Sequence, residues 1–309
     1  MRYSLLISAS LLASVQGHGL VTSIQGANGV TMPGLSVADG TPRDCSTNKC
    51  GSQADTAIIR DRELGTEKAS ALGRTQGNGP IDAATMIQNF MGAASAPTNN
   101  GSAASAGVED NLSGLNKAQG KRSSFASRGL GDLFSGLIGG GKGAGTKTET
   151  AAETNVAASA GTGASSGLPT CADDGSITMT FRQINQDGAG PLTAAVDGTS
   201  GGTDASAFKD AEVTQDVPGL GFQGLSLATN TDFPVTVQMP AGMTCDATVA
   251  GVDNVCVVRV RNGAAAGPFG GSAAFTMSAT AQKRALAYRM KMKKRGEQQA
   301  AKQHHRRFR

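Results

Sequence analysis

The sequence of 309 residues contains no tryptophan and only two tyrosines, Tyr3 and Tyr288, so residues 18–282 contain neither. Aromatic residues of all kinds make up 4% of the chain. Large, rigid aromatic rings are the usual stacking surfaces of a binding site. Their scarcity therefore counts against a sugar-binding site built on aromatic platforms.

Histidine is equally scarce, since the chain has three, at positions 18, 304 and 305. A Ser-His-Asp hydrolase needs a histidine base, and residues 18–282 offer only His18 for that role. The sequence also lacks C-x-x-C, H-E-x-x-H and P-loop motifs, so zinc catalysis and nucleotide hydrolysis have no support. No run of about 18 apolar residues follows position 17, and we expect no transmembrane segment.

The chain has unusually many glycines, 43, together with 17% charged residues, which fits an all-β or loop-rich protein better than a helical one. Charge is distributed unevenly. Residues 283–309 carry a net charge of +10, whereas residues 18–282 carry −7. A basic run of this kind is typical of a solvated tail. Nucleic-acid binding would need a basic surface on the folded part as well, so we expect no nucleic-acid partner.

The first 17 residues have the pattern of a secretory signal peptide: Arg2, an apolar stretch from Leu5 to Val15, and small residues before Gly17. Cleavage there would make His18 the first residue of an extracellular, secreted protein. Asn100 and Asn111 begin N-x-S motifs and are candidate glycosylation sites.

Five cysteines in a secreted chain allow two disulfides and leave one thiol over. Cys45 and Cys50 are close enough to close a small loop, and Cys245 and Cys256 flank an expected hairpin. Cys171 would then be free or would compete for a partner.

Composition divides the chain after the signal peptide into four parts. Residues 92–170 are rich in Gly, Ala, Ser and Thr and read as a low-complexity, disordered linker insert. Residues 171–282 show strand-like alternation around 177–181, 233–239 and 275–279, and a continuous apolar run at 255–260. Residues 18–91 offer one strand at 20–24 and one short helix, opened by Pro80, with apolar residues at 83, 87, 90 and 91. We therefore expect 18–91 and 171–282 to form one domain, and 283–309 to be a basic disordered tail.

The spacing of these strands favours an all-β fold, a single immunoglobulin-like or monooxygenase-like β-sandwich. Four stretches also resemble a known family: HGLVTSIQGANGVTMPG at 18–34, TPRDC with CGSQADTAIIRDRELG within 41–65, FRQINQDGAGPLTAAVDGTSGGTD at 181–204, and DFPVTVQMPAGMTC with VCVVRVRNGAAAGPFGGSAAFT within 232–276. They are similar to the fungal appressorium-associated penetration factors of the Egh-type, or Gas and Mas, group. The resemblance implies a secreted fungal virulence protein linked to host or cuticle penetration. It implies no particular reaction.

His18 is the most suggestive residue for chemistry, because an N-terminal histidine can chelate a metal through its α-amine and Nδ1. Copper monooxygenases that act on polysaccharides are also β-sandwiches, but they complete the site with a second histidine. Imidazole suits copper, and the other two histidines of this chain lie in the basic tail. Copper on His18 is therefore the only cofactor that we consider.

Other motifs carry weaker signals. Two G-x-S-x-G matches and one G-x-G-x-x-G match lack the expected strand and helix context. Asp187, Asp197 and Asp204 are acids of a loop-rich stretch, for which surface positions are the default explanation. The run Arg60-Asp61-Arg62-Glu63 reads as a solvated segment with exposed ion pairs.

The sequence thus predicts a secreted protein that acts at the host or cell-wall interface by binding, with a wall or cuticle polymer as its partner and without catalysis. The alternative is a copper-dependent, monooxygenase-like enzyme built on His18. A third possibility is a structural wall protein held through the linker and its glycans. None of these readings specifies an oligomeric state.

Overall fold

The computed structural model describes residues 18–47, 50–95, 98–99, 145–148, 150–186, 188–219, 226, 228–264 and 267–307. The expected signal peptide at 1–17 lies outside these residues, as do the candidate glycosylation sites Asn100 and Asn111. Within the described ranges, no helix combines the length and the apolar character needed to cross a membrane.

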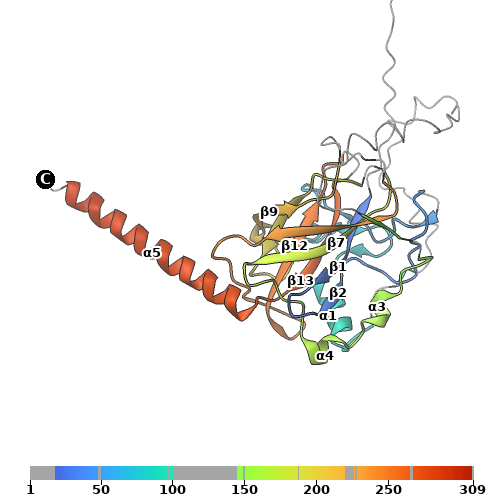
Figure 1. The fold of residues 1–309 in the computed structure, drawn as a ribbon, viewed down its shortest axis with the longest axis horizontal. Coiled ribbons are helices and arrows are strands. Elements are labelled where there is room, and N and C mark those ends of the chain that lie inside the picture. Colours follow the sequence, from blue (N-terminus) through green and yellow to red (C-terminus); the bar gives the residue numbers. More distant parts are fainter. Residues whose placement is uncertain are drawn as a thin grey trace, which may run out of the picture.

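The fold is all-β and antiparallel, which confirms the expected fold class (Figure 1). Thirteen strands follow one curled sheet in the order β2-β1-β7-β10-β9-β8-β12-β13-β3-β4-β5, with β11 paired to β12 and β6 to β10. The strands are β1 Gly19–Gln25, β2 Thr31–Pro33, β3 Ala57–Ile58, β4 Arg74–Thr75, β5 Gly79–Pro80, β6 Thr146–Lys147, β7 Ser176–Gln183, β8 Thr193–Asp197, β9 Lys209–Gln215, β10 Thr231–Gln238, β11 Ala247–Val249, β12 Val252–Arg261 and β13 Phe269–Phe275. The helices are α1 Ala83–Phe90, α3 Asn155–Ala158, α4 Gly163–Ser166 and α5 Ala279–Arg307, with a 3₁₀ turn at Ala205–Ala207.

The curl brings β1 against β13, so that two parts of the sheet face each other as in a sandwich. A Cβ added to Gly271 on β13 would lie 2.6 Å from the backbone nitrogen of Val21 on β1. Only glycine allows this close approach. The core between the two parts is formed by buried side chains that include Leu20, Ile24, Met179, Phe181, Val235, Val258, Val260 and Phe275.

The expected short helix is present as α1, but it begins later than the sequence suggested. Pro80 lies in β5, and the helix begins at Ala83 after the N-cap Asp82, whose carboxylate accepts a hydrogen bond of 2.9 Å from the amide of Ala84. A short acidic side chain satisfies an otherwise unpaired amide at a helix start. Ile87 and Phe90 are fully buried, as the apolar stripe predicts.

Residues 145–170, the last part of the expected linker insert, are folded onto the domain. They contain β6, which pairs with β10, and the short helices α3 and α4. Val156 in α3 is completely buried, and its carbonyl accepts a hydrogen bond of 3.1 Å from Asn89 in α1. The prediction of a linker over 92–170 is therefore wrong for this part, because a few specific contacts anchor a segment of unpromising composition.

The basic tail is a helix rather than a disordered segment. Helix α5 runs from Ala279 to Arg307 and projects away from the sheet (Figure 1). Its first turns pack on the domain, because Ala281 and Ala285 are buried and Arg289 donates to the carbonyl of Gly242 at 2.6 Å. The expected strand at 275–279 is also wrong, since β13 ends at Phe275 and the helix begins four residues later.

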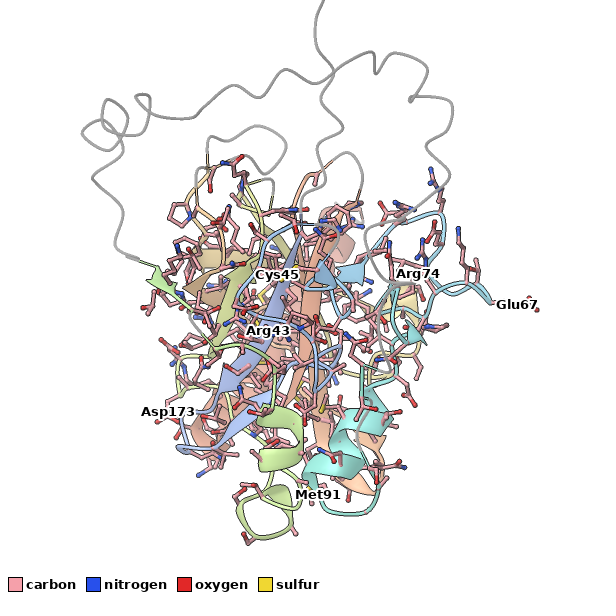
Figure 2. All side chains as sticks on the ribbon, turned by 90° about the vertical axis from the view of Figure 1, so that its right-hand side faces the viewer. Arg43, Cys45, Glu67, Arg74, Met91 and Asp173 are labelled. Atoms are coloured by element: carbon pink, nitrogen blue, oxygen red, sulfur yellow. A yellow bond between two sulfur atoms is a disulfide. The ribbon has the colours of Figure 1, made fainter. Side chains whose placement is uncertain are left out.

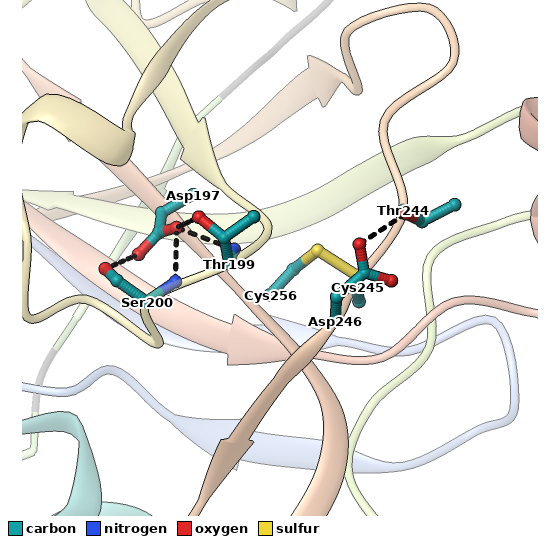
Figure 3. The surroundings of a disulfide bond; sticks show 7 residues. All are labelled: Asp197, Thr199, Ser200, Thr244, Cys245, Asp246 and Cys256. Carbon is teal, nitrogen blue, oxygen red and sulfur yellow. Dashed lines mark hydrogen bonds between the residues drawn. A yellow bond between two sulfur atoms is a disulfide. The ribbon is translucent and has the colours of Figure 1, made fainter. Parts of the chain in front are cut away.

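Both expected disulfides are present, joining Cys45 to Cys50 and Cys245 to Cys256. The second one connects the segment before β11 to β12 and lies close to the end of β8 (Figure 3). Cys171 forms no disulfide and is buried. Burial raises the pKa of its thiol above the ordinary value, which disfavours the reactive thiolate.

Candidate functional site

The side chain of His18 is buried and held on two sides at the start of β1. Its ring stacks on Phe269, with 4.3 Å between the ring centroids and an interplanar angle of 29°. Asn185 contacts both ends of the residue: its Oδ1 accepts a hydrogen bond of 2.9 Å from the His18 backbone nitrogen, and its Nδ2 lies 3.3 Å from the His18 Nδ1. The backbone nitrogen and Nδ1 of His18 therefore both face one amide group.

These two nitrogens are the donors that a copper chelate on His18 would use. The other two histidines lie in the last turns of α5, at the end of the helix that projects from the domain (Figure 1). Among the described residues, no group of three or more His, Cys, Asp and Glu side chains is arranged to hold a metal ion. The structure thus brings together two nitrogen atoms that could bind copper, the backbone nitrogen and Nδ1 of His18. Copper binding at His18 stays a prediction.

The acids of the loop-rich stretch have structural roles where they are described. Asp197 accepts hydrogen bonds from the amides of Thr199 and Ser200 and from the Ser200 hydroxyl (Figure 3). It also accepts one from the amide of Gly202. Burial alone would raise the pKa of Asp197, but these hydrogen bonds outweigh it and lower the pKa. Asp204 caps the 3₁₀ turn by accepting a bond of 2.8 Å from the Ser206 amide. Asp187 lies outside the described residues.

The run at 60–63 is not solvated at its two ends. Arg60 and Glu63 are buried and form an ion pair of 3.2 Å, and Glu63 also accepts a bond of 2.9 Å from Arg74. Burial would raise the pKa of Glu63, but the arginines hold it at about 2. The prediction of exposed ion pairs is therefore wrong for Arg60 and Glu63, whereas Asp61 forms a partly exposed ion pair with Arg261.

A polar groove of about 510 Å³ lies between the sheet and residues 150–162, and we call it the hydroxyl groove. Eight of its fifteen lining residues carry a side-chain hydroxyl: Thr22, Ser23, Thr31, Thr150, Thr154, Ser159, Thr162 and Thr180. One wall comes from β1, β2, β7 and β10, and the other from the segment that contains α3. Hydroxyls both donate and accept hydrogen bonds, so this lining suits a ligand that is itself rich in hydroxyl groups.

Arg182 is the main charged group of this lining. Its Nε and Nη2 donate to the two carboxylate oxygens of Asp232 at 2.8 and 2.9 Å, and Nη2 also donates to the Thr148 hydroxyl at 2.6 Å. Its third nitrogen, Nη1, is buried and has no hydrogen-bond partner in the described structure. Unpaired buried donors are costly, and this one lies within the wall of the groove, without an acceptor among the described residues.

The second wall of the groove is fixed by a buried ion cluster. Arg43 pairs with Asp55 at 2.5 Å and with Glu153 at 3.0 Å, and all three side chains are at most 5% exposed. Figure 2 shows Arg43 within the body of the molecule. Burial would lower the pKa of Arg43, but the two carboxylates outweigh it and raise the pKa, so the cation persists. Because Glu153 belongs to the folded part of the insert, this cluster holds residues 150–162 beside the sheet.

The hydroxyl groove could not be predicted from the sequence, because about half of its lining residues belong to a segment interpreted as a linker. The one available signal was the isolated pair Glu153 and Val156 within a stretch of small residues, a carboxylate and an apolar side chain that could each be buried. Neither side chain indicates its partner, since Arg43 is 110 residues away from Glu153 along the chain.

The comparisons with known proteins agree with the resemblance seen in the sequence. The chain is 53% identical over 292 residues to the appressoria-specific virulence factor GAS2 of Pyricularia oryzae, covering 94% of each chain. It is 36% identical to the appressoria-specific virulence factor GAS1 of the same fungus, covering 93% of this chain and 84% of that one. No solved structure matches the chain significantly. Residues 16–270 match the Egh16-like virulence factor model. The chain therefore belongs to the Egh16-like virulence factor family.

Proposed function

We propose that this protein is a secreted virulence factor of the appressorium that acts by binding a hydroxyl-rich polymer of the wall or cuticle in the hydroxyl groove. The family and the names of its relatives support the virulence role. The observation that carries the binding role is the groove itself, in which hydroxyl side chains from the sheet face hydroxyl side chains from residues 150–162.

The groove contains no aromatic side chain among its lining residues, so recognition must rest on hydrogen bonds rather than on ring stacking. A typical hydrogen bond contributes a net 0.5–1.5 kcal/mol, roughly. Tight binding then requires many such bonds along a repeating ligand. A polysaccharide meets this requirement, because each sugar unit presents several hydroxyls in the same arrangement.

The test is co-sedimentation of the full chain with insoluble chitin and cellulose, with and without a chelator. A double variant, Thr31→Val with Thr154→Val, removes one exposed hydroxyl from each wall and keeps the side-chain shape. Loss of two hydrogen bonds of ordinary strength corresponds to about tenfold weaker binding. Thr178→Val with Thr214→Val removes two exposed hydroxyls from β7 and β9, outside the groove, and is the matched control.

We expect retention of the wild type and of the control, weaker retention of the groove variant, and no effect of the chelator. Equal retention of both double variants would show that the polymer binds elsewhere. A wild-type protein that stays in solution with every wall polymer would contradict the proposed function.

A second candidate function is copper-dependent oxidative cleavage of polysaccharide, which the chelating arrangement at His18 favours. A copper ion held there would supply the redox chemistry, with the backbone nitrogen and Nδ1 as ligands and Phe269 fixing the ring. The donor set is incomplete for copper, because the described residues bring no second imidazole to this place.

Copper titration of protein shown by mass spectrometry to begin at His18 separates the two candidates. One tightly bound Cu(II) that is lost in His18→Ala, together with oxidised oligosaccharides when a reductant is supplied, would favour the enzyme. Weak binding that persists in His18→Ala would remove the copper candidate and leave polymer binding.

A further inference from the structure

A second groove, of about 470 Å³, lies over strands β8, β9 and β12. Arg259 and Arg261 of β12 line one side, and Asp210 and Asp216 line the other. Small side chains such as Ala195 lie between the two sides. We call this the charged groove, because its basic and acidic residues are separated rather than paired across it.

The strand register explains the separation. Arg259 is directly opposite Ala195 on β8, and Ala195 is directly opposite Asp210 on β9. Neighbouring strands are about 4.8 Å apart, so the Cα atoms of Arg259 and Asp210 are about 10 Å apart with only a methyl group between them. In the described part of the chain, no ion pair joins these two residues. The space above Ala195 can therefore hold a group that contacts both.

Four arginines in the described residues are buried: Arg43, Arg60, Arg182 and Arg259. The first three each contact a carboxylate within 3.2 Å. Arg43 pairs with Asp55 and Glu153, Arg60 pairs with Glu63, and Arg182 pairs with Asp232. Arg259 is 8% exposed, and within the described ranges no carboxylate lies within 4 Å of it. A buried charge is costly unless it is paired. Arg259 is thus the exception among the buried arginines, and it lines a groove.

The guanidinium of Arg259 is fixed in place without a carboxylate. Its Nη1 donates to the carbonyl of Ala71, and its central carbon lies 4.2 Å from the centre of the Phe208 ring. Burial, and then the neighbouring Arg261, lower the pKa of Arg259 to about 10, and they outweigh Asp61 and Asp197, which raise it from beyond ion-pair distance. A preorganised, partly desolvated arginine is well suited to bind a carboxylate or phosphate.

We propose that the charged groove binds an acidic sugar unit of a wall polysaccharide, with its carboxylate on Arg259 and its hydroxyls on Asp210. Arg261, which is paired with the exposed Asp61 at 2.6 Å, lies beside Arg259 and adds positive charge to the same side of the groove. This inference rests on the proposed function for the polymer class, but it uses a different groove. Asp210 and Asp216 favour a uronate over a phosphate as the bound anion. They would repel a doubly charged phosphate, whereas a uronate carries one negative charge and several hydroxyl donors that a carboxylate accepts.

The test is calorimetric titration of the full chain with hexagalacturonate, cellohexaose and inorganic phosphate at physiological salt. Arg261→Gln removes the more exposed cation, Arg259→Lys keeps the charge but not the planar fork, and Ala195→Val fills the space between the charges. Arg295→Gln in α5 removes the same charge from the projecting helix and controls for general attraction of a polyanion. Thermal unfolding of each variant identifies any that fail to fold.

We expect hexagalacturonate to bind the wild type and Arg295→Gln equally, and to bind Arg261→Gln and Ala195→Val at least tenfold more weakly. Cellohexaose binding should not change with Arg261→Gln. Equal hexagalacturonate binding by Arg261→Gln, Arg259→Lys and the wild type would overturn the inference, as would binding of phosphate in place of hexagalacturonate. Because neutral polymers and the Thr31 and Thr154 variant test the hydroxyl groove separately, failure of one proposal is distinguishable from failure of the other.

Discussion

Residues 145–170 and most of helix α5 were both expected to be disordered. In the structure both are ordered, but they are attached to the domain to different extents. Residues 145–170 have little apolar surface but are held by Glu153, by Val156 and by the pairing of β6 with β10. Helix α5 is longer and more regular, but its contacts with the domain, in the part of the helix whose side chains are described, come from its first turns. Attachment therefore depends on a few buried contacts and not on composition or regularity.

The largest expected effect comes from breaking the ion cluster that anchors residues 145–170. Arg43→Met should lower the free energy of unfolding by about 3–5 kcal/mol, because it leaves Asp55 and Glu153 buried without their cation. Urea unfolding measures this loss. Arg295→Met in the exposed part of α5 should change it by less than about 0.5 kcal/mol. Similar values for the two variants would contradict the difference between the regions.

A smaller loss of unfolding free energy is expected when Glu153, the member of the ion cluster that lies in residues 145–170, is changed. Glu153→Gln should cost about 2 kcal/mol at pH 7, the range for hydrogen bonds to charged groups, since Arg43 keeps Asp55.

The pH dependence of that variant gives a separate prediction. Burial would raise the pKa of Glu153, but Arg43 outweighs it and holds the pKa below the ordinary 4.5. A carboxylate with a lowered pKa stabilises the fold above its unfolded pKa, and the stabilisation is lost as the pH falls through its folded pKa. Unfolding free energies of the wild type and Glu153→Gln should therefore converge as the pH falls below about 4.5. A constant difference down to pH 2 would show that the Glu153 charge is not the cause.

The smallest effects concern α5. Removing residues 283–309 should cost about 1 kcal/mol, because it removes buried Ala285 and the hydrogen bonds that Arg284 and Arg289 donate to Asp173 and Gly242. Removing residues 293–309 should leave the melting temperature unchanged, because the packed turns remain. Scanning calorimetry of both truncations checks this. A large loss from the shorter truncation would show that the outer part of α5 packs on the domain.

The strands that could be predicted from the sequence are those in which the pattern of apolar side chains matches the pattern of burial in the structure. Alternation in β7 and β10 and the apolar run in β12 are buried on the expected faces. Strand β9 was missed because Lys209–Gln215 has exposed charged residues on both faces, and β13 because small residues such as Gly271 and Ala273 give no period. Helix α5 is rich in Ala, Lys, Arg, Gln and Met, which are strong helix formers, a signal that its charge obscured.

The sites were harder to predict than the fold. His18 and the disulfides stand out in a sequence because their residue types are rare. The two grooves do not, because they are lined by common threonines, alanines and arginines whose positions depend on strand register. That Arg259 lacks a carboxylate is visible only when every neighbouring strand is in place.

The projection of α5 gives the protein a large electric dipole. A helix of 29 residues is about 44 Å long, several times the Debye length of about 8 Å at physiological salt. Most of the net charge of +10 over residues 283–309 is therefore carried on a helix that extends well beyond the screening distance from a body whose net charge is −7. Near a negatively charged surface, such a molecule approaches with the helix leading, so the two grooves take one orientation relative to the surface rather than a random one.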